Sequence, residues 1–320
     1  MSPLARLLGQ FKGRRVAVLG DFVADVFIYG EISRISREAP VLVLNQRDSQ
    51  LVPGGGANAV YNLHTLGAVP LPVGVVGNDV EGFQLIHFFN KLGIDTRGIR
   101  VEKSWRTPTK TRILAGAVHG QRQQIVRLDS GGPLKRAPRL SSKLPSCDAL
   151  LVSDYGYGVI TPEFVSRIRR RGIPATIDSR FSIDRFAGMT AATPNEPEVE
   201  AILGIHIGND SKKLEWAGRK LLRKLKHQAL VITRGKDGMA VFEKGKKTEH
   251  IAIHGSDEIA DVTGAGDTVI ATFTLALAAG ATFSQAARLA NYAGGIVVMK
   301  YGTRPVLYSE LLQAVQGDNS

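Results

Sequence analysis

Residues 261–279 read DVTGAGDTVIATFTLALAA, and they carry the clearest structural signal in the chain. The segment after Asp267 is apolar nearly all round, which is typical of a buried helix. The small residues Gly264, Ala265 and Gly266 let the backbone approach a ligand closely. The free N–H groups and the positive dipole end of a helix start favour an anion. The stretch therefore predicts a phosphate site at the start of a buried helix.

The carboxylate of Asp267 would normally repel a phosphate at this helix start. Its placement makes sense if Asp267 accepts the proton of a substrate hydroxyl while that hydroxyl attacks phosphorus. The backbone N–H groups of 264–266 would then stabilise charge on the transferring phosphoryl group, as an anion hole. In the alternative, Gly264 and Gly266 make a turn and Asp267 only caps the helix. Spacing alone leaves both interpretations open.

Strand-then-helix units surround this stretch along the chain. Short apolar runs predict strands at 15–19, 41–44, 71–76, 149–153, 175–177, 230–233 and 239–242. We expect the first strand to end in a loop at Gly20-Asp21. Longer periodic segments predict helices at 57–66, 82–92, 162–171, 195–203, 212–225, 267–279, 284–300 and 309–315. This alternation indicates an α/β fold with a mostly parallel central sheet and helices on both faces.

Two further segments do not follow this alternation. The runs 110–118 and 123–128 are joined at His119-Gly120 and predict a hairpin without an intervening helix. Together with the strand at 41–44, they predict a small β-lid formed by about residues 30–50 and 108–129. Because unpaired strand edges seek partners, we expect a homodimer that forms through the lid. No Pro/Gly/Ser linker separates two units, so we expect a single domain over residues 1–320.

The composition argues against several classes of protein. Lys and Arg number 41 against 29 Asp and Glu, a net charge of +12, but the densest basic stretches are not interleaved with aromatic residues. Such diffuse charge does not define a nucleic-acid site, and we expect no nucleic-acid partner. Cys147 is the only cysteine, so no disulfide framework forms within one chain. Without a run of roughly 20 apolar residues or a signal-peptide pattern, we expect a cytoplasmic location and no membrane attachment.

Four motifs in sequence order resemble the ribokinase / phosphofructokinase-B family of sugar kinases. They are PGGGAN at 53–58, TPNEPE at 193–198, TRG at 233–235 and DVTGAGD at 261–267. The resemblance covers nearly the whole chain. It implies a ribokinase-like three-layer α/β/α fold and an ATP-dependent carbohydrate kinase that uses Mg²⁺ and has Asp267 as its base. A requirement for a monovalent cation such as K⁺ is left open.

The same resemblance implies roles for further residues. On the acceptor side, it implies that sugar hydroxyls contact Asp25, Gly55, Gly56 and Asn58. Asp154 follows a predicted strand, at the carboxyl end where open α/β sheets place ligands, and is a further candidate for the sugar. On the nucleotide side, the resemblance implies Asn195, Thr233, Gly235, Gly238, Thr263 and Asn291. Asn195 and Glu198 lie about one helical turn apart and would organise Mg²⁺ through water.

A purely structural role stays open as an alternative for these residues. Asp25 could cap a loop, and Asn195 with Glu198 could be a helix start that exposes polar side chains. Asn291 could pair with the backbone in place of adenine, since a buried amide needs a partner in either case.

A narrower resemblance concerns the sugar. The segments at 20–25, 33–40, 123–129 and 261–270 are similar to D-glycero-β-D-manno-heptose 7-phosphate kinases, which phosphorylate the anomeric hydroxyl on the way to ADP-heptose for lipopolysaccharide. This implies a small-molecule sugar phosphate as the partner. Candidates for binding its distal phosphate are Arg34, Arg37, Arg127 and Arg180. Because the chain ends at Ser320, we expect the form of the kinase without a following nucleotidyltransferase domain.

Departures from that pattern keep other acceptors open. Arg37, Tyr157 and Ser179-Arg180 stand where heptose kinases usually have Pro, Lys and Pro-Lys. The changes leave the reaction type alone, but fructose 1- or 6-phosphate, tagatose 6-phosphate and ribose remain alternative acceptors.

Two other classes of protein are alternatives. Gly54-x-Gly56-x-x-Ala59 satisfies a dinucleotide-binding pattern, but Pro53 interrupts the approach and the first strand lacks the motif. The other class is a non-catalytic regulator that binds a sugar or a nucleotide. Asp267 argues against it, because a protein that only binds does not need a base.

Overall fold

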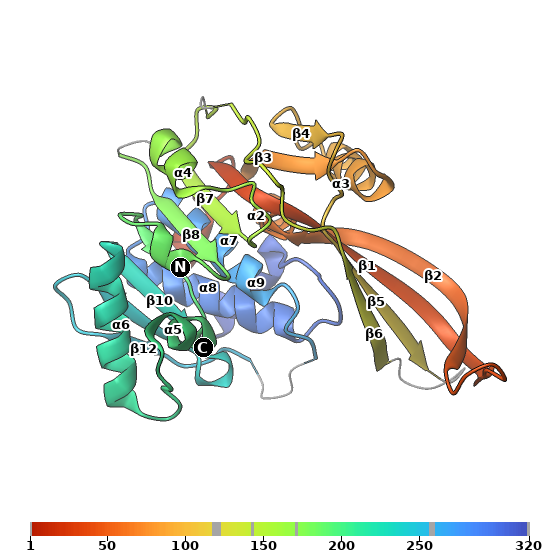
Figure 1. Cartoon of the computed structure of the whole chain (residues 1–320). Coiled ribbons are helices and arrows are strands. Elements are labelled where there is room, and N and C mark those ends of the chain that lie inside the picture. The colour runs from red at the N-terminus through yellow and green to blue at the C-terminus, as the bar shows by residue number, and fades with distance from the viewer. Residues whose placement is uncertain (1, 117–122, 142–143, 170–171, 256–259, 319–320) are drawn as a thin grey trace.

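Strands and helices alternate along the chain and build three layers (Figure 1). The computed structural model describes residues 2–116, 123–141, 144–169, 172–255 and 260–318. The main sheet consists of β1 (Arg15–Ile35), β3 (Val69–Gly77), β4 (Ile99–Glu102), β7 (Ala149–Asp154), β8 (Ala175–Ser179), β9 (Ala191–Ala192), β10 (Ala229–Thr233), β11 (Met239–Glu243) and β12 (Glu249–Ile251). Their order is β12-β11-β10-β9-β8-β7-β1-β3-β4. Neighbours run parallel except β10–β11 and β11–β12, which are antiparallel.

Helices cover both faces of this sheet because its strands are apolar on both sides. In β1, Val16 and Val18 pack with one set of helices, and Ala17 and Leu19 pack with the other. The first set is α1 (Pro3–Leu8), α2 (Gly56–Thr65), α3 (Val80–Lys91), α7 (Ala265–Ala278), α8 (Phe283–Val298) and α9 (Tyr308–Gly317). The second set is α4 (Pro162–Ile168), α5 (Glu196–Leu203) and α6 (Ser211–Leu225). The predicted α/β architecture with a mostly parallel sheet is confirmed.

The first strand is much longer than predicted, and the loop expected at Gly20-Asp21 is wrong. β1 pairs with β7 up to Gly20 and with β3 up to Asp21, and it continues without a break to Ile35. The apolar run does not stop at Gly20, because Phe22 and Val23 are also buried. Gly20 serves close packing here, since a Cβ at this position would lie 3.0 Å from the Cα of Gly56.

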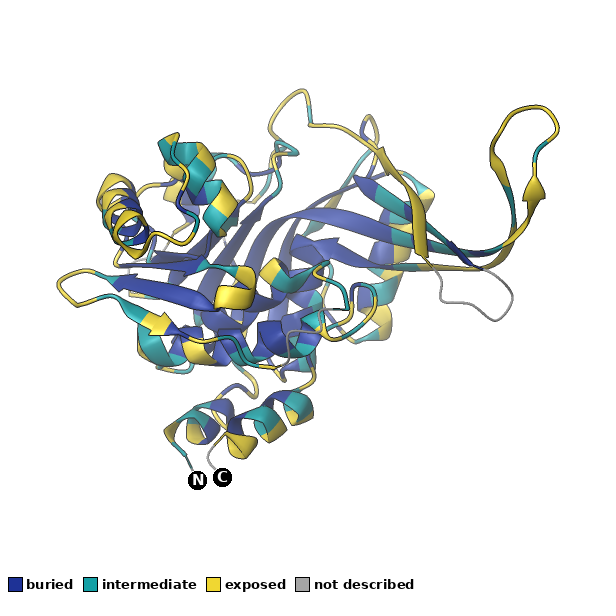
Figure 2. Cartoon of the chain, turned by 90° about the horizontal axis from the view of Figure 1, so that it is seen from below, coloured by how far each residue is buried: buried dark blue, intermediate teal, exposed yellow. Residues whose placement is uncertain are grey.

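Beyond Asp21, β1 belongs to a second sheet, the lid sheet, with β2 (Leu42–Gly55), β5 (Thr109–Gly116) and β6 (Gln123–Ser130). The lid sheet projects from the three-layer body (Figure 1), and its outer end is largely exposed (Figure 2). The antiparallel β5–β6 pair confirms the predicted hairpin, whose turn at 119–120 lies outside the described residues. β2 is longer than the strand expected at 41–44, because it pairs with β1 over its whole length.

Smaller differences concern short elements. The helix expected at 162–171 ends at Ile168, and α1, β4 and β9 were not predicted. Among the described helices, none has both the length and the apolar character needed to cross a membrane.

Candidate active site

Helix α7 begins in a conformation that requires glycine. Its N-cap, Gly264, has φ of 80°, and a Cβ there would lie 2.6 Å from Nδ2 of Asn58. The amide of Ala265 donates to the carbonyl of Val262 (3.2 Å), whereas the amides of Gly264 and Gly266 have no acceptor among the described residues. Two of the three predicted anion-hole amides are therefore available to a ligand.

Asp261 fixes the loop that leads into α7. One carboxylate oxygen accepts the amide of Thr263 (2.9 Å), and the other accepts the amide of Gly302 (3.1 Å). Thr263, which the sequence assigned to the nucleotide side, lines the same cavity as the start of α7. The aspartate at the start of the motif thus acts on the backbone, and the aspartate at its end faces the cavity.

The carboxylate of Asp267 is buried and held at both oxygens. Asn58 Nδ2 donates to Oδ2 (3.1 Å) and the hydroxyl of Tyr155 donates to Oδ1 (2.9 Å). Burial raises the pKa of Asp267 to about 7, and these two hydrogen bonds act in the opposite direction. No side chain caps α7, so the capping role weighed for Asp267 is not seen. A carboxylate with a pKa near neutrality suits a general base.

Asp267 faces a cavity of about 410 Å³ between the main sheet and the lid sheet. It lies at the carboxyl ends of parallel strands, where α/β sheets place ligands. The lining residues are Val23, Asp25, Gly55, Lys110, Arg112, Arg127, Tyr155, Asp178, Arg180, Thr193, Asn195, Glu198, Thr233, Val262, Thr263, Gly264, Gly266 and Asp267.

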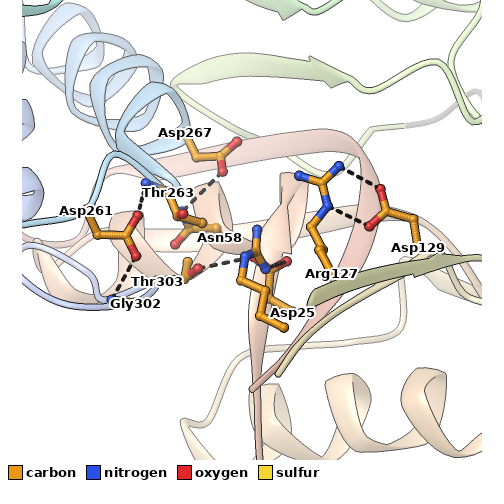
Figure 3. Close-up of polar contacts among 10 residues, drawn as sticks. Asp25, Asn58, Arg127, Asp129, Asp261, Thr263, Asp267, Gly302 and Thr303 are labelled. Carbon is orange, nitrogen blue, oxygen red and sulfur yellow. Dashed lines mark hydrogen bonds and ion pairs between the residues drawn. The ribbon is translucent and has the colours of Figure 1, made fainter. Parts of the chain in front are cut away.

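Asp25 lines this cavity from β1, but its carboxylate is already paired. Arg112 donates to Oδ1 (2.8 Å), and Thr303 donates to Oδ2 (3.1 Å; Figure 3). The side chains of the Arg112–Asp25 pair are 9% and 6% exposed. Gly54 allows β2 to pass closely, because a Cβ there would lie 2.7 Å from the Asp25 carboxylate. Asp25 can reach a sugar only together with its guanidinium partner.

The other predicted acceptor residues lie at the junction of β2 and α2. Gly55 lines the cavity, and its φ of 55° favours glycine. Gly56 packs against Gly20. Asn58 lies behind the cavity wall, where it holds Asp267 (Figure 3).

Four cationic side chains line the cavity, three from the lid sheet and Arg180 from the segment after β8, and they differ in their partners. Arg127 is held by both oxygens of Asp129 (2.8 and 3.0 Å), and Arg112 is held by Asp25. Lys110 and Arg180 have no carboxylate partner within the described part of the chain. Burial, followed by the charge of Arg180, lowers the pKa of Lys110. This end of the cavity is thus suited to an anion.

Arg34 and Arg37, the remaining phosphate candidates, are exposed near the outer end of the lid sheet and are not among the residues that line the cavity.

The nucleotide-side residues divide into two groups. Asn195, Glu198 and Thr233 line the cavity. Gly235, Gly238 and Asn291 are not among the lining residues, and the amide of Asn291 donates to the carbonyl of Ala252 (2.7 Å). Asn291 has therefore found the backbone partner that was weighed as its alternative role.

Asn195 and Glu198 form a capping box at the start of α5. The Glu198 amide donates to the Asn195 side chain (2.8 Å), and the Asn195 amide donates to the Glu198 carboxylate (2.9 Å). Burial raises the pKa of Glu198. The pKa of Asp178 is raised well above its usual range, first by burial and then by the nearby charge of Glu198. A divalent cation near Asp178 and Glu198 would stabilise both ionised forms. The oxygen donors of Asp178, Glu198 and Asn195 suit Mg²⁺, which prefers oxygen ligands and keeps several of its waters.

Asp154 is fully engaged away from the cavity lining. Its Oδ2 accepts the hydroxyls of Ser179 (2.7 Å) and Ser182 (2.8 Å), and its Oδ1 accepts the amide of Gly156 (3.0 Å). The residue that does face the cavity at this strand end is its neighbour Tyr155. The sequence reasoning missed Tyr155, together with Lys110, Arg112 and Asp178. Lys110 and Arg112, two apart on β5, carried the one usable signal, because such residues share a strand face.

The geometry can be compared with known proteins. A family model described as the pfkB family carbohydrate kinase matches residues 14–143 and 176–309. The chain belongs to this family. It is an ATP-dependent carbohydrate kinase. The predicted family resemblance is confirmed.

Curated relatives are more than a third identical to this pfkB-family chain over the aligned residues. The protein named "Bifunctional protein HldE" from Coxiella burnetii is 39% identical over 318 residues, which is 96% of this chain. A protein of the same name from Geobacter sulfurreducens is 39% identical over 92% of this chain. The chain spans 65% and 61% of the length of these two relatives.

Solved structures agree on the ribokinase-like fold. Arabidopsis thaliana ribokinase, complexed with ribose and ATP, has a TM-score of 0.74 at 19% identity and covers 95% of this chain and 99% of its own. Phosphofructokinase-2 from Escherichia coli, in complex with fructose-6-phosphate, has a TM-score of 0.73 at 15% identity and covers 97% of this chain and 100% of its own.

Proposed function

We propose that this pfkB-family kinase phosphorylates D-glycero-β-D-manno-heptose 7-phosphate at its anomeric hydroxyl, giving the 1,7-bisphosphate for ADP-heptose and lipopolysaccharide synthesis. The observation that carries the proposal is a pair of cations, Lys110 and Arg180, that line the cavity of Asp267 and have no carboxylate partner among the residues the structure describes. An unphosphorylated sugar would leave both charges unused, whereas a second phosphate on the sugar would pair with them. The similarity to proteins named HldE supports the same sugar.

The chain's own residues supply the chemistry. Asp267 takes the proton of the acceptor hydroxyl while that oxygen forms a bond to the γ-phosphorus of ATP and the bond to ADP breaks. The free amides of Gly264 and Gly266 stabilise charge on the transferring group. Asp178, Glu198 and Asn195 would hold a hydrated Mg²⁺, which neutralises phosphate charge when it is bound. The lid sheet excludes water and so favours a sugar as the acceptor.

The test is ATP consumption with a panel of acceptors. The panel holds heptose 7-phosphate, fructose 1-phosphate, fructose 6-phosphate, tagatose 6-phosphate and ribose, each assayed with the native chain and with Asp267→Asn. We expect turnover with heptose 7-phosphate alone, lost in the variant. Turnover with another phosphorylated sugar would replace the heptose and keep the phosphate subsite. Turnover with ribose alone would overturn both the heptose 7-phosphate acceptor and the phosphate subsite. Binding without any turnover would favour the non-catalytic regulator.

We further propose that two copies associate through the lid sheet. The support is a group of apolar side chains exposed on it: Ile35 (66%), Leu42 (43%), Val126 (49%) and Leu128 (63%). Exposed apolar side chains that gather on one sheet mark an association surface. Light scattering should give a dimer for the native chain and a monomer for Val126→Lys/Leu128→Lys, with Leu307→Lys outside the lid as the control. A monomeric native chain would contradict this proposal.

A further inference from the structure

Tyr155 follows β7 in a segment whose backbone amides donate hydrogen bonds to a buried carboxylate. Asp21 of β1 is 0% exposed, and its Oδ2 accepts the amides of both Tyr155 (2.8 Å) and Tyr157 (3.0 Å). Its Oδ1 has no hydrogen-bond partner among the described residues. Burying a carboxylate costs free energy unless hydrogen bonds compensate for the lost water. The amides of Tyr155 and Tyr157 supply two such bonds to Asp21.

The side chain of Tyr155 then reaches the base. Its hydroxyl donates to Oδ1 of Asp267 (2.9 Å), while Asn58 donates to Oδ2. Burial, together with the charges of Asp267 and Asp178, raises the pKa of Tyr155 well above its usual range, so the phenol stays a neutral donor. With a donor at each oxygen, the carboxylate plane is fixed relative to the cavity.

The ring of Tyr155 also contacts the lid sheet. Nζ of Lys110 on β5 lies 5.3 Å from the ring centroid, within the range of a cation–π contact. One side chain therefore touches the base through its hydroxyl and the lid through its ring.

We propose that Tyr155 is a positioning residue that orients the carboxylate of Asp267 toward the acceptor hydroxyl, and that Asp21 acts through it by fixing its backbone. This proposal rests on Asp267 as the base, and it does not depend on which sugar is the acceptor. The consequence is a measurable one, because a hydrogen bond to the ionised carboxylate favours that form. Without the phenol, Asp267 is harder to ionise, and the acidic limb of the activity profile moves to higher pH.

Other charged groups face Asp267 and must stay unchanged in the test. They come from several elements and line the same cavity: Asp25 of β1, Lys110 and Arg112 of β5, Arg127 of β6, Asp178 of β8, Arg180 directly after β8, and Glu198 of α5. The charge of Asp25 raises the pKa of Asp267 and that of Lys110 lowers it, both by less than the Tyr155 hydrogen bond does. Tyr155→Phe leaves each of these charges in place.

The variant to measure is Tyr155→Phe, with Tyr61→Phe as the matched control. Tyr61 is half-buried on α2, the helix that carries Asn58, and its ring packs on Phe88. We expect Tyr155→Phe to lower kcat about tenfold at neutral pH and to move the acidic limb up by about one pH unit, the size expected for a hydrogen bond to a charged group. Tyr61→Phe should match the native profile. A loss of kcat with an unmoved acidic limb would overturn the proposal, since it indicates a merely structural role.

A second readout needs no acceptor sugar. In protein labelled with ¹³C at aspartate carboxyls, the Asp267 resonance is the one that Asp267→Asn removes, and it should titrate at higher pH in Tyr155→Phe. An unchanged titration overturns the Tyr155 role even if no sugar on the panel is turned over. The role of Asp21 is tested by Asp21→Ser. This substitution should move the acidic limb of the activity profile to higher pH in the native background, and it should cause no further shift when Tyr155→Phe is already present. Additive shifts would show that Asp21 acts by another route.

Discussion

Nδ2 of Asn58 lies 3.1 Å from Oδ2 of Asp267, although the two residues are 209 positions apart in the chain. The orientation of the Asn58 amide is fixed from the other side, because its Oδ1 accepts Nδ2 of Asn62 (3.0 Å). The nitrogen of Asn58 must therefore face the carboxylate and donate to it. The glycine-rich start of α2 and the glycine-rich start of α7 meet at this bond and build one site.

Replacing Asp267 tests its proposed role as the base. Asp267→Asn keeps the shape of the side chain and should leave the fold and ATP affinity intact, but it cannot accept the proton. We expect kcat to fall by about 10²–10⁴-fold, the usual range for a general base. Steady-state kinetics with ATP titration calorimetry on the same preparation measures both quantities. Turnover within threefold of the native value would remove Asp267 from the mechanism.

The buried pair of Asp25 and Arg112 makes a second prediction. Asp25→Ala should abolish measurable sugar affinity and keep ATP affinity. Arg112→Met should destabilise the fold by about 3–5 kcal/mol, because it leaves the Asp25 carboxylate buried without compensation. The double variant Asp25→Asn/Arg112→Met should recover part of that loss in urea unfolding. Unchanged sugar affinity in Asp25→Ala would place the acceptor elsewhere.

Lys110 and Arg180, which have no carboxylate partner in the described part of the chain, predict a selective effect on the acceptor. Lys110→Met and Arg180→Met should each raise KM for the phosphorylated sugar by about tenfold or more, since a charge-assisted hydrogen bond contributes about 1.5–3 kcal/mol. KM for ATP should change little. Lys91→Met at the end of α3 makes the same charge change far from the cavity and serves as the control. Equal increases for both substrates would argue against a phosphate subsite at this end.

Asp21 predicts how stability depends on pH. Burial raises its pKa to about 7 from 3.8, so the folded state binds a proton that the unfolded chain has released. The contribution of this proton binding to the free energy of unfolding is fully present below about pH 4 and is lost as the pH rises toward 7. Asp21→Asn cannot titrate, so its urea midpoint should fall less steeply than that of the native chain between pH 4.5 and 7.5. Parallel curves would show that Asp21 is ionised throughout.

The sequence predicted the body of the fold better than the lid. Buried parallel strands such as β7 are apolar on both faces, and their runs are visible in the sequence. The outer part of β2 is not, because residues 45–50 are exposed polar side chains on a projecting ribbon. Strand formation there comes from pairing with β1, and no alternation of apolar residues records it.

In the site too, residues that stand in sequence motifs could be predicted, whereas residues brought together by strand packing could not. Asp267, Asn195, Glu198 and Thr233 stand in motifs and do line one cavity. Tyr155 and Asp178 carry no motif, since their roles depend on which strand ends meet. Arg112 could not be paired with Asp25 before the register of β5 against β1 was known. Such pairings are properties of the sheet, and the local sequence does not contain them.

β1 runs for 21 residues through both sheets without an interruption. It carries no loop between the body and the lid that could act as a hinge, so any lid motion along this connection must bend and twist the strand itself. The change in backbone torsion would be spread around residues 21–24, where the partners of β1 change from β3 and β7 to β2 and β5. Asp21 and Asp25 border this bending zone. Mechanical movement of the lid and the positions of both carboxylates are therefore coupled through one continuous piece of backbone.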